Sequence, residues 1–276
     1  KYIGEVSDLF PPDYSNYNFN IHLDHPLVSV IIPTLNRYDD LKYALLDLDN
    51  QHYKHFEVII VDQSDNFSKS FYEKFDSKIK VIRQVDKALW KARNDAIKCS
   101  NGNYILLFDD DSRVGPDWIN EHLKCIDYFK SPISAGVSIS KIGAPIPKHY
   151  SFFRWGDQID TGNVMIKRQV FQNYGLFDRK FEKMRMGDSE YGVRCYLQGC
   201  KIINNPKAQR LHIKSTEGGL RFFGHWDGMR PKKIFSARPV PSILYLFRKY
   251  WGLKPTLYFL IRFIPISLSP YKLKGR

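Results

Sequence analysis

Apolar runs and helical repeats alternate through the first half of the chain. Four runs rich in β-branched and aliphatic residues predict strands, and the first of them lacks polar alternation, as expected for a strand covered on both faces. These runs are 28–33 (VSVIIP), 56–62 (FEVIIVD), 78–83 (KIKVIR) and 104–109 (YILLFD). Helices are expected between them, where Leu41, Ala44, Leu45 and Leu48 recur at helical spacing, and over 88–98 and 116–129. This alternation predicts an α/β fold, with a mostly parallel, Rossmann-like sheet flanked by helices.

The pattern changes after Ile133 and divides the chain into sections. Shorter strands are expected over 133–140 and 161–167, and a helix over 188–197 that ends near Gly199. Residues 1–26 are interrupted by prolines and are interpreted as an N-terminal arm, with the catalytic domain over 27–227. Residues 228–276 form a basic aromatic C-terminal extension, in which six prolines are expected to limit helix length.

Composition places the chain among globular proteins and locates its charge. The 276 residues are 43% hydrophobic, which excludes disordered and collagen-like classes. The net charge is +13, but residues 228–276 hold 11 basic and no acidic side chains, so the rest of the chain carries only +2. The basic character therefore belongs to the extension.

Cysteine usage and apolar run length give expectations about compartment. Four cysteines without a C-x-x-C pair do not form a disulfide framework, which favours a reducing compartment. The sequence begins at Lys1 without a basic-then-apolar leader, so secretion is unsupported, and no apolar run reaches the roughly 20 residues of a membrane helix. A cytoplasmic protein is expected, peripheral on the inner face of the cell membrane if the extension binds lipid.

Three consecutive carboxylates carry the sharpest chemical signal. Asp109, Asp110 and Asp111 follow an apolar strand directly and precede a helix that opens with Pro116. Mg²⁺ and Mn²⁺ prefer oxygen ligands, relieve the mutual repulsion of carboxylates and bridge phosphates. The alternative is a solvated loop that caps the helix.

Six segments occur in an order that resembles the inverting glycosyltransferases of family 2, which have the nucleotide-sugar-binding GT-A fold. The segments are VSVIIPTLNR (28–37), VIIVDQSDN (58–66), ALWKARNDAI (88–97), YILLFDDDSRV (104–114), GNVMIKRQVFQNYGLFD (162–178) and GDSEYGVRCYLQG (187–199). The resemblance covers about Leu27 to His212. It implies a nucleotide-sugar half over 27–130 and an acceptor half over 131–227.

The resemblance implies which residues bind the donor, a nucleoside-diphosphate sugar and in first place a UDP-sugar. The implied donor-binding residues are Pro33, Thr34, Asn36, Arg37, Asp62, Arg93, Asp109 and Asp110. Arg93 is expected to face the nucleotide, although a structural ion pair is the alternative. Two departures occur: family members commonly have Asp-Asp-Gly where this chain has Asp62-Gln63-Ser64, and a glycine-bearing segment is replaced by Val85-Asp86-Lys87. Lys87 is a candidate substitute for a phosphate contact.

The resemblance also implies a divalent metal, Mn²⁺ or Mg²⁺. Asp111 is the implied carboxylate ligand and His212 the implied nitrogen ligand, with Ser215 and Thr216 as candidate phosphate contacts. A lone histidine is otherwise more often structural.

Asp188 matches the family's catalytic base, which deprotonates the acceptor hydroxyl; a helix cap is the alternative role. The glutamate that precedes this base in the family is Gly187 here, so Glu190 is a candidate for a supporting role. The expected acceptor-binding residues are Trp155, Gly162, Asn163 and Glu190. Trp90, Trp155 and Trp226 are candidates to stack on sugars, and core packing is the alternative for each.

The expected function is metal-dependent, inverting transfer of a sugar to a hydroxyl of a glycan or lipid-linked acceptor, in surface polysaccharide biosynthesis. The extension mixes aromatic and basic residues in a way suited to an anionic membrane surface, while packing on the catalytic domain is the alternative. An inactive sugar-nucleotide-binding or glycan-binding protein remains open because of the missing glutamate. A nucleic-acid-binding protein would explain the basic extension but not the ordered motifs, so no nucleic-acid partner is expected.

Overall fold

The computed structural model describes residue 17 and residues 25–75, 79–140, 146–215, 218–219 and 240–268, with side chains omitted for 240 and 263–268. Most of the expected N-terminal arm, Thr216, Trp226 and the segment 220–239 lie outside the described residues. The expected helices and strands of the catalytic domain lie within them.

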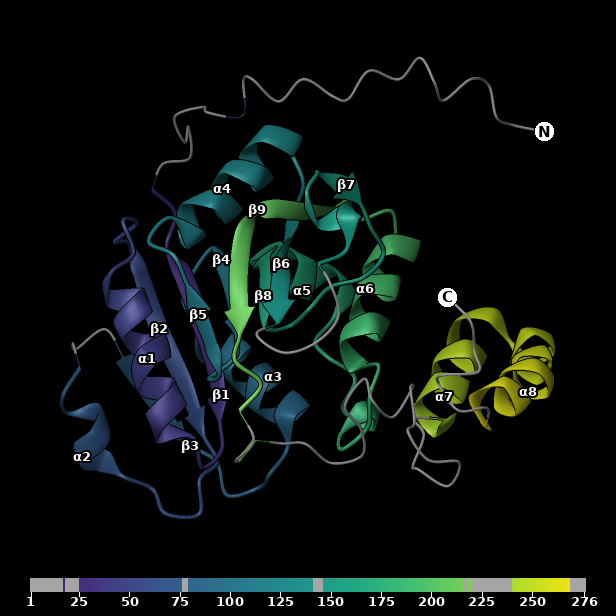
Figure 1. The fold of residues 1–276 in the computed structure, drawn as a ribbon, viewed down its shortest axis with the longest axis horizontal. Helices are drawn as coiled ribbons and strands as arrows, with labels where there is room; N and C mark the ends of the chain where they lie inside the picture. The colour runs from purple at the N-terminus through teal and green to yellow at the C-terminus, as the bar shows by residue number, and fades with distance from the viewer. Residues whose placement is uncertain are drawn as a thin grey trace.

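Four parallel strands form the first half of a nine-stranded sheet (Figure 1). They are β1 (Val28–Thr34), β2 (Phe56–Asp62), β3 (Ile79–Arg83) and β4 (Tyr104–Phe108), and each lies where the apolar runs predict it. Their order across the sheet is β3-β2-β1-β4, so the carboxyl ends of all four meet at one edge. Ligands of open α/β sheets bind at such an edge.

The second half of the sheet mixes strand directions. It contains β8 (Asn163–Lys167), β6 (Ile133–Ser140), β9 (Ile202–His212), β5 (Ser112–Val114) and β7 (Arg154–Trp155). β8 pairs antiparallel with β4 and β6, whereas β9 runs parallel to β6, so most strands still share one direction. β9 is not predicted because the polar run Asn204–Lys207 interrupts its apolar pattern, and the register against β6 shifts there.

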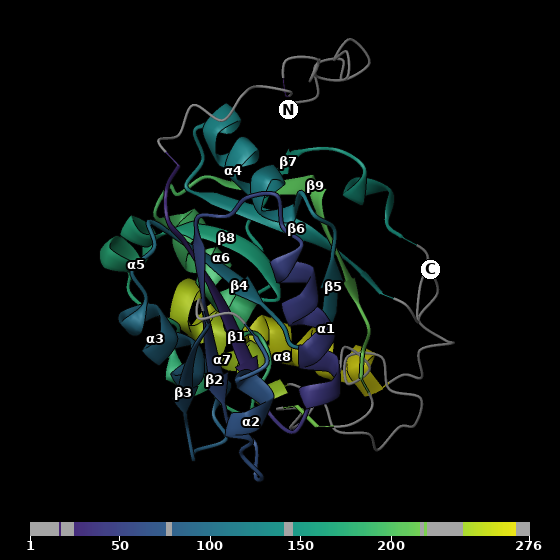
Figure 2. The ribbon, with the colours of Figure 1, turned by 90° about the vertical axis from the view of Figure 1, so that its left-hand side faces the viewer.

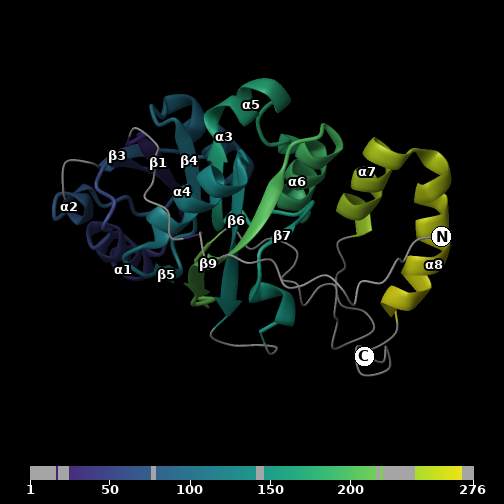
Figure 3. The same cartoon turned by 90° about the horizontal axis from the view of Figure 1, so that it is seen from above.

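Helices cover both faces of the sheet, which confirms the expected α/β architecture (Figure 3). The apolar side chains of α1 (Tyr38–Asp49) and α4 (Trp118–Phe129) pack on one face. Those of α3 (Leu89–Cys99), α5 (Arg168–Tyr174) and α6 (Gly187–Leu197) pack on the other. The short elements are α2 (Lys69–Tyr72), η3 (Lys148–Tyr150) and η4 (Arg179–Phe181). Figure 2 views the molecule from the side of α1 and α2.

Two helices of the C-terminal extension form a hairpin beside α6 (Figure 1). They are α7 (Val240–Trp251) and α8 (Leu253–Leu268), which are longer than the prolines of this section lead one to expect. Pro241 and Pro255 lie in the first turns, where a helix needs no backbone N–H donor. Within the described part of the chain, no helix combines the length and apolarity needed to cross a bilayer.

Candidate active site

A cavity of about 630 Å³ opens at the carboxyl edge of the parallel strands. One side is lined by the ends of β1, β2 and β4 and by the first turns of α3. The other is lined by β6, by the segment before β8, by the start of α6 and by β9. Expected site residues that line the cavity are Pro33, Thr34, Arg37, Trp90, Arg93, Asp109, Asp110, Asp111, Asp188 and His212. The fold therefore brings the acidic triplet and the expected catalytic base into one cavity.

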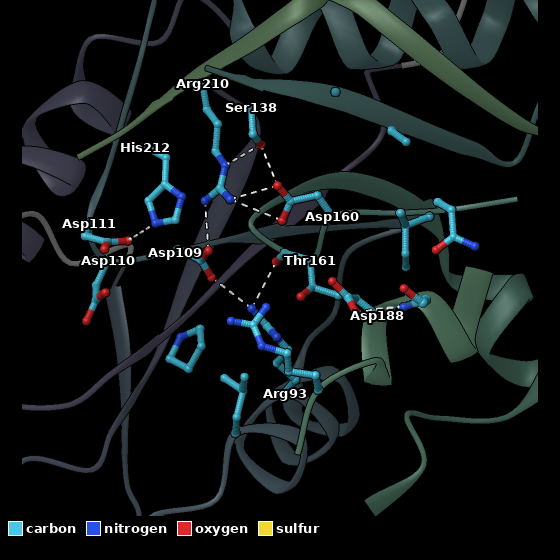
Figure 4. A pocket seen from close by; sticks show the side chains of 18 of the residues that line it. Arg93, Asp109, Asp110, Asp111, Ser138, Asp160, Thr161, Asp188, Arg210 and His212 are labelled. Atoms are coloured by element: carbon cyan, nitrogen blue, oxygen red, sulfur yellow. Dashed lines mark hydrogen bonds and ion pairs between the residues drawn. The ribbon is translucent and has the colours of Figure 1, made fainter. Parts of the chain in front are cut away.

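Asp109 is held between two buried guanidinium groups (Figure 4). One oxygen of Asp109 accepts a hydrogen bond from Arg93 at 2.9 Å, and the other accepts one from Arg210 at 2.8 Å. Burial alone would raise the pKa of Asp109, but Arg210 and Arg93 outweigh it and hold that pKa below its usual range. Asp109 is therefore a fixed anion in the floor of the cavity.

Arg210 joins Asp109 to a second carboxylate. Its Nη2 lies 3.1 and 2.9 Å from the two oxygens of Asp160, and Ser138 donates to Asp160 at 2.6 Å. Gly162 lies against this ion-pair network, because a Cβ there would come within 2.2 Å of both Asp109 and Arg210. The glycine at 162 therefore allows the close approach of the chain to the network.

Asp110 turns away from Asp109 toward the end of β1. It accepts hydrogen bonds from Thr34 at 2.8 Å and from Arg37 at 3.1 Å. Burial raises the pKa of Asp110 to about 7, although Arg37 opposes the shift. Asp110 thus ties the acidic segment to the Pro33–Arg37 loop, two segments expected to bind the donor.

Asp111 faces His212, the other expected metal ligand. An oxygen of Asp111 lies 3.3 Å from Nε2 of His212, and the second oxygen accepts from the backbone N–H of Ser215 at 3.3 Å. Burial opposes ionisation, but the contacts with His212 and Arg37 outweigh it and hold the pKa of Asp111 well below its usual range. Strand pairing creates this contact, because Ser112 of β5 lies opposite His212 of β9.

These two side chains fit a divalent metal that also binds phosphates. No group of three His, Cys, Asp or Glu side chains able to hold a metal occurs among the described residues. Mg²⁺ is, however, commonly bound through one or two carboxylates together with substrate phosphates and water. Asp111 supplies one such carboxylate, with a ring nitrogen of His212 beside it, although Arg37 also lies 3.4 Å from Asp111. Asp109 is engaged by two arginines.

Asp188 lies in the first turn of α6, on the opposite side of the cavity (Figure 4). Burial and the nearby anion Asp160 raise the pKa of Asp188, while Arg93 opposes them. A raised pKa increases the basicity of the carboxylate, which favours proton acceptance.

The preceding Gly187 has a packing reason. A Cβ at 187 would lie 2.3 Å from the ring of Trp90, so the indole fills the space that a glutamate side chain would need. Trp90 itself is 5% exposed and donates to the carbonyl of Phe181 at 3.0 Å, which is a core role. With Trp90 in this place, a residue with a side chain at 187 would need the indole to move.

Several expected donor residues lie outside the cavity lining. Asp62 is fully buried and accepts hydrogen bonds from Tyr38 at 2.6 Å, from Tyr72 at 2.8 Å and from the Ser64 backbone. Asn36 and Asp65 bond each other reciprocally at the surface, and Lys87 pairs with Asp65 at 2.6 Å. Asp62, Asn36 and Lys87, which are expected from the sequence to contact the nucleotide sugar, are thus each bonded to other side chains of the protein.

Expected acceptor residues also differ in their placement. Trp155 is 69% exposed on β7, outside the cavity lining. Asn163 is buried and bonds Trp118, His122 and two backbone carbonyls, which joins β8 to α4, β6 and β9. Glu190 points beneath α7, where Arg194, Lys249 and Tyr250 bind it.

Three residues of the cavity were not predicted from the sequence: Asp160, Arg210 and Ser138. The only sign in the sequence that they belong to a site is that each is a polar residue within a mostly apolar stretch.

The sequence of this chain is similar to those of known glycosyltransferases. Residues 29–203 match the family described as Glycosyl transferase family 2. Glycosyltransferase GlyA of Streptococcus pneumoniae serotype 4 is 30% identical over 167 residues, which cover 58% of this chain and 22% of that protein. The chain spans less than a third of the length of the first curated relatives that it matches.

Solved structures of similar fold include two complexes with sugar nucleotides. The mannosyltransferase PcManGT of Pyrobaculum calidifontis, in complex with GDP-Man and Mn²⁺, aligns with a TM-score of 0.64 and 16% identity, covering 88% of this chain and 72% of that one. Residues 1–349 of S. aureus TarS, in complex with UDP-GlcNAc, align with a TM-score of 0.61 and 18% identity, covering 87% and 78%. At these identities the likeness extends to the fold.

Proposed function

This chain belongs to glycosyltransferase family 2 and has the GT-A fold, and from that premise we propose that it is a metal-dependent inverting glycosyltransferase. The donor in this proposal is a nucleoside-diphosphate sugar, in first place a UDP-sugar. The acceptor is a hydroxyl of a glycan or of a lipid-linked glycan.

One observation carries the proposal: Asp188 and the Asp109–Asp111 segment line the same cavity from opposite sides. A donor bound at the strand ends and an acceptor bound near α6 would meet between these two groups. The raised pKa of Asp188 suits a carboxylate that accepts the proton of the attacking hydroxyl. That oxygen attacks the anomeric carbon from the face opposite the departing diphosphate, so a single displacement inverts the configuration.

The donor side of the cavity holds two guanidinium groups that would contact the leaving diphosphate. Arg37 and Arg93 line it, and both are almost completely buried. Their carboxylate partners Asp110 and Asp109 hold them in position before a donor binds. Such preorganised charge stabilises an anion that develops during transfer.

A divalent metal belongs to the proposal, supported by Asp111 beside His212 and by the Mn²⁺ in the complex of the similarly folded mannosyltransferase. Asp111 and His212 are the residues that would hold the ion. When bound, the metal would neutralise charge on the diphosphate.

A membrane surface is the proposed location of the acceptor. α8 exposes a group of apolar side chains, Leu257, Tyr258 and Ile261, and α7 and α8 also carry Arg248, Lys249, Lys254 and Arg262. Such a mixture is typical of helices that lie in a lipid interface. The hairpin stands beside α6, so binding to lipid through α8 would hold the catalytic cavity near membrane-linked acceptors.

The substitution Asp188→Asn tests the proposal. Because the amide cannot accept the proton, we expect turnover in a transfer assay to fall by roughly 10²–10⁴-fold, with donor affinity nearly unchanged. The anomeric configuration of the wild-type product, read by NMR, should be inverted relative to the donor.

Asp39→Asn is the matched control, since Asp39 lies exposed in the first turn of α1. It should retain wild-type turnover. Wild-type turnover in Asp188→Asn, or retained configuration in the product, would contradict the proposed mechanism.

A further inference from the structure

Arg154 of β7 is an exposed arginine that lines the cavity. Asn204, its partner in the pairing of β7 with β9, lines the cavity too. Burial and Asp160 raise the pKa of Tyr150, another lining residue, and the nearby charge of Arg154 opposes them. The neighbouring Trp155 lies on the opposite face of the strand, because side chains alternate along a strand. The guanidinium of Arg154 therefore faces the cavity.

No carboxylate of the described residues pairs with Arg154, in contrast to three other arginines of the cavity lining. Those three form close ion pairs, namely Arg37 with Asp110, Arg93 with Asp109, and Arg210 with Asp109 and Asp160. A guanidinium is always charged and can bind two oxygens of a carboxylate or phosphate at once. Arg154 is therefore available to an anionic ligand.

Arg154 lies far from the place that the proposed function gives to the diphosphate of the donor. Asn204, opposite Arg154, pairs with Ala135 of β6, whereas His212 pairs with Ser140 of the same strand. Ala135 and Ser140 are five residues apart, which corresponds to about 17 Å at about 3.3 Å per residue. An anion bound by Arg154 is therefore separate from a diphosphate held beside His212.

Arg154 lies instead on the side of the cavity that holds the proposed base. The segment that follows it packs against α6, because a Cβ at Gly192 would lie 2.5 Å from the carbonyl oxygen of Asp157. Asp188 lies one turn before Gly192 on this helix. Arg185, in the segment before α6, is a second arginine that lines this side. An acceptor with its hydroxyl at Asp188 would thus extend along this segment toward Arg154.

The carboxylates on this side of the cavity do not neutralise Arg154. Asp160 is bound through both oxygens by Arg210. Asp188 is the proposed base, and Asp157 is exposed outside the cavity lining. The acceptor side of the cavity therefore presents positive charge that the protein itself leaves unbalanced at Arg154.

We propose that Arg154 binds an anionic group of the acceptor, a carboxylate or a phosphate, and thereby selects charged glycans over neutral ones. Resting on the proposed function, this inference names the acceptor class: a glycan that carries an acidic sugar or a phosphate near the accepting hydroxyl. Both anions present oxygens that the guanidinium can bind in pairs. Because Arg154 is exposed, salt should weaken the interaction.

Ligand-observed NMR titration of the full chain, with UDP and Mn²⁺ filling the donor site, tests the inference with three probes built on one sugar. The probes are methyl β-D-glucoside, methyl β-D-glucuronide and the 6-phosphate of methyl β-D-glucoside. We expect at least one charged probe to bind at least tenfold more tightly than the neutral glucoside, and the tighter of the two identifies the anion. Equal affinity for all three probes, or no binding of either charged probe, would overturn the inference.

Arg154→Gln removes the charge and keeps a long polar side chain. The preference for the charged probe over the neutral one should fall at least tenfold in this variant, while its affinity for UDP stays that of the wild type. Lys201→Gln is the matched control, because Lys201 is an exposed cation beside Trp155 and outside the cavity lining, and it should keep the full preference.

A preference that persists in Arg154→Gln would overturn the inference and leave the proposed function untouched. Wild-type protein that binds neither UDP nor GDP in the presence of Mn²⁺ would overturn the proposed function and the inference with it. In a transfer assay with a charged acceptor, Arg154→Gln should raise the acceptor KM at least tenfold and leave kcat nearly unchanged, as expected for a lost binding contact.

Discussion

At the residue scale, three adjacent aspartates have three different environments. Asp109 lies between Arg93 and Arg210, and its pKa is lowered, whereas burial raises the pKa of Asp110 to about 7. Asp111 faces His212, and its pKa is also lowered. The tertiary surroundings therefore decide the charge of each carboxylate: burial prevails at Asp110, and basic partners prevail at Asp109 and Asp111.

Asp111→Asn should abolish the gain in nucleotide affinity that a divalent metal provides. The amide keeps a hydrogen-bond acceptor for the Ser215 backbone but is a poorer ligand for a hard cation. Titration calorimetry of UDP with and without Mn²⁺ measures the gain, and His212→Ala should show a smaller loss of it.

Asp65→Asn is the matched control for the metal, because Asp65 is an exposed carboxylate on the neighbouring loop. It should keep the full gain from Mn²⁺. Equal UDP affinity of the wild type with and without divalent ion would refute metal dependence.

At the element scale, α6 connects the cavity that holds Asp188 to the C-terminal helices. Its first turn holds Asp188 in the cavity, while Glu190, two residues on, is fully buried on another side. Lys249 of α7 bridges Glu190 at 2.8 Å and Asp178 at 2.9 Å. α7 is thus fastened to the helix that carries the proposed base.

Lys249→Met should lower the free energy of unfolding at pH 7 by about 1–2 kcal/mol. This is the usual range for a hydrogen bond to a charged group, reduced because the Lys249 side chain is partly exposed. Lys249 contributes to the lowered pKa values of Glu190 and Asp178. The stability that it adds to the folded protein is therefore fully present at pH values above the ordinary carboxyl pKa of about 4. It is lost as the pH falls through the lowered folded-state values, because the carboxylates then become neutral.

Urea denaturation across pH 3–7 measures this difference between variant and wild type. The two free energies should converge toward pH 3. Lys254→Met, at an exposed position of α8, is the control and should change stability little at any pH. A difference that stays constant with pH would contradict the electrostatic explanation.

At the scale of the whole molecule, the C-terminal hairpin divides its apolar residues between two environments. Ile243 and Leu246 of α7 are buried, whereas Tyr258 and Ile261 of α8 are 58% and 73% exposed. α7 thus packs on the α/β domain, whereas α8 leaves apolar side chains uncovered within the described residues, and binding of the extension to a membrane surface stays a prediction.

Replacing Leu257, Tyr258 and Ile261 together by Ser should weaken co-sedimentation with anionic liposomes strongly, because these side chains would enter the lipid interface. The wild type should bind anionic vesicles far better than neutral ones and should lose binding as salt rises, since each basic residue near the surface contributes about 1 kcal/mol.

Val85→Ser is the control for lost apolar surface, because Val85 is 81% exposed and lies far from the hairpin along the chain. It should sediment like the wild type. Equal sedimentation of the triple variant and the wild type would show that α8 does not enter the lipid interface.

The sequence by itself determined the parallel half of the sheet and the family. The runs that became β1, β2 and β4 consist of residues that are almost all buried on both faces, so their apolar character is continuous and readable without a partner. The motifs around Arg93, Asp109–Asp111 and Asp188 are local in sequence, and all of them reached the cavity.

Tertiary structure alone decided which polar side chains face a ligand. Arg210 and Asp109 are 101 residues apart, and the buried roles of Asp62 and Glu190 depend on tyrosines, Arg194 and Lys249 from other elements or turns. A side chain's type follows from the sequence, but its free hydrogen-bonding capacity depends on neighbours that only folding supplies.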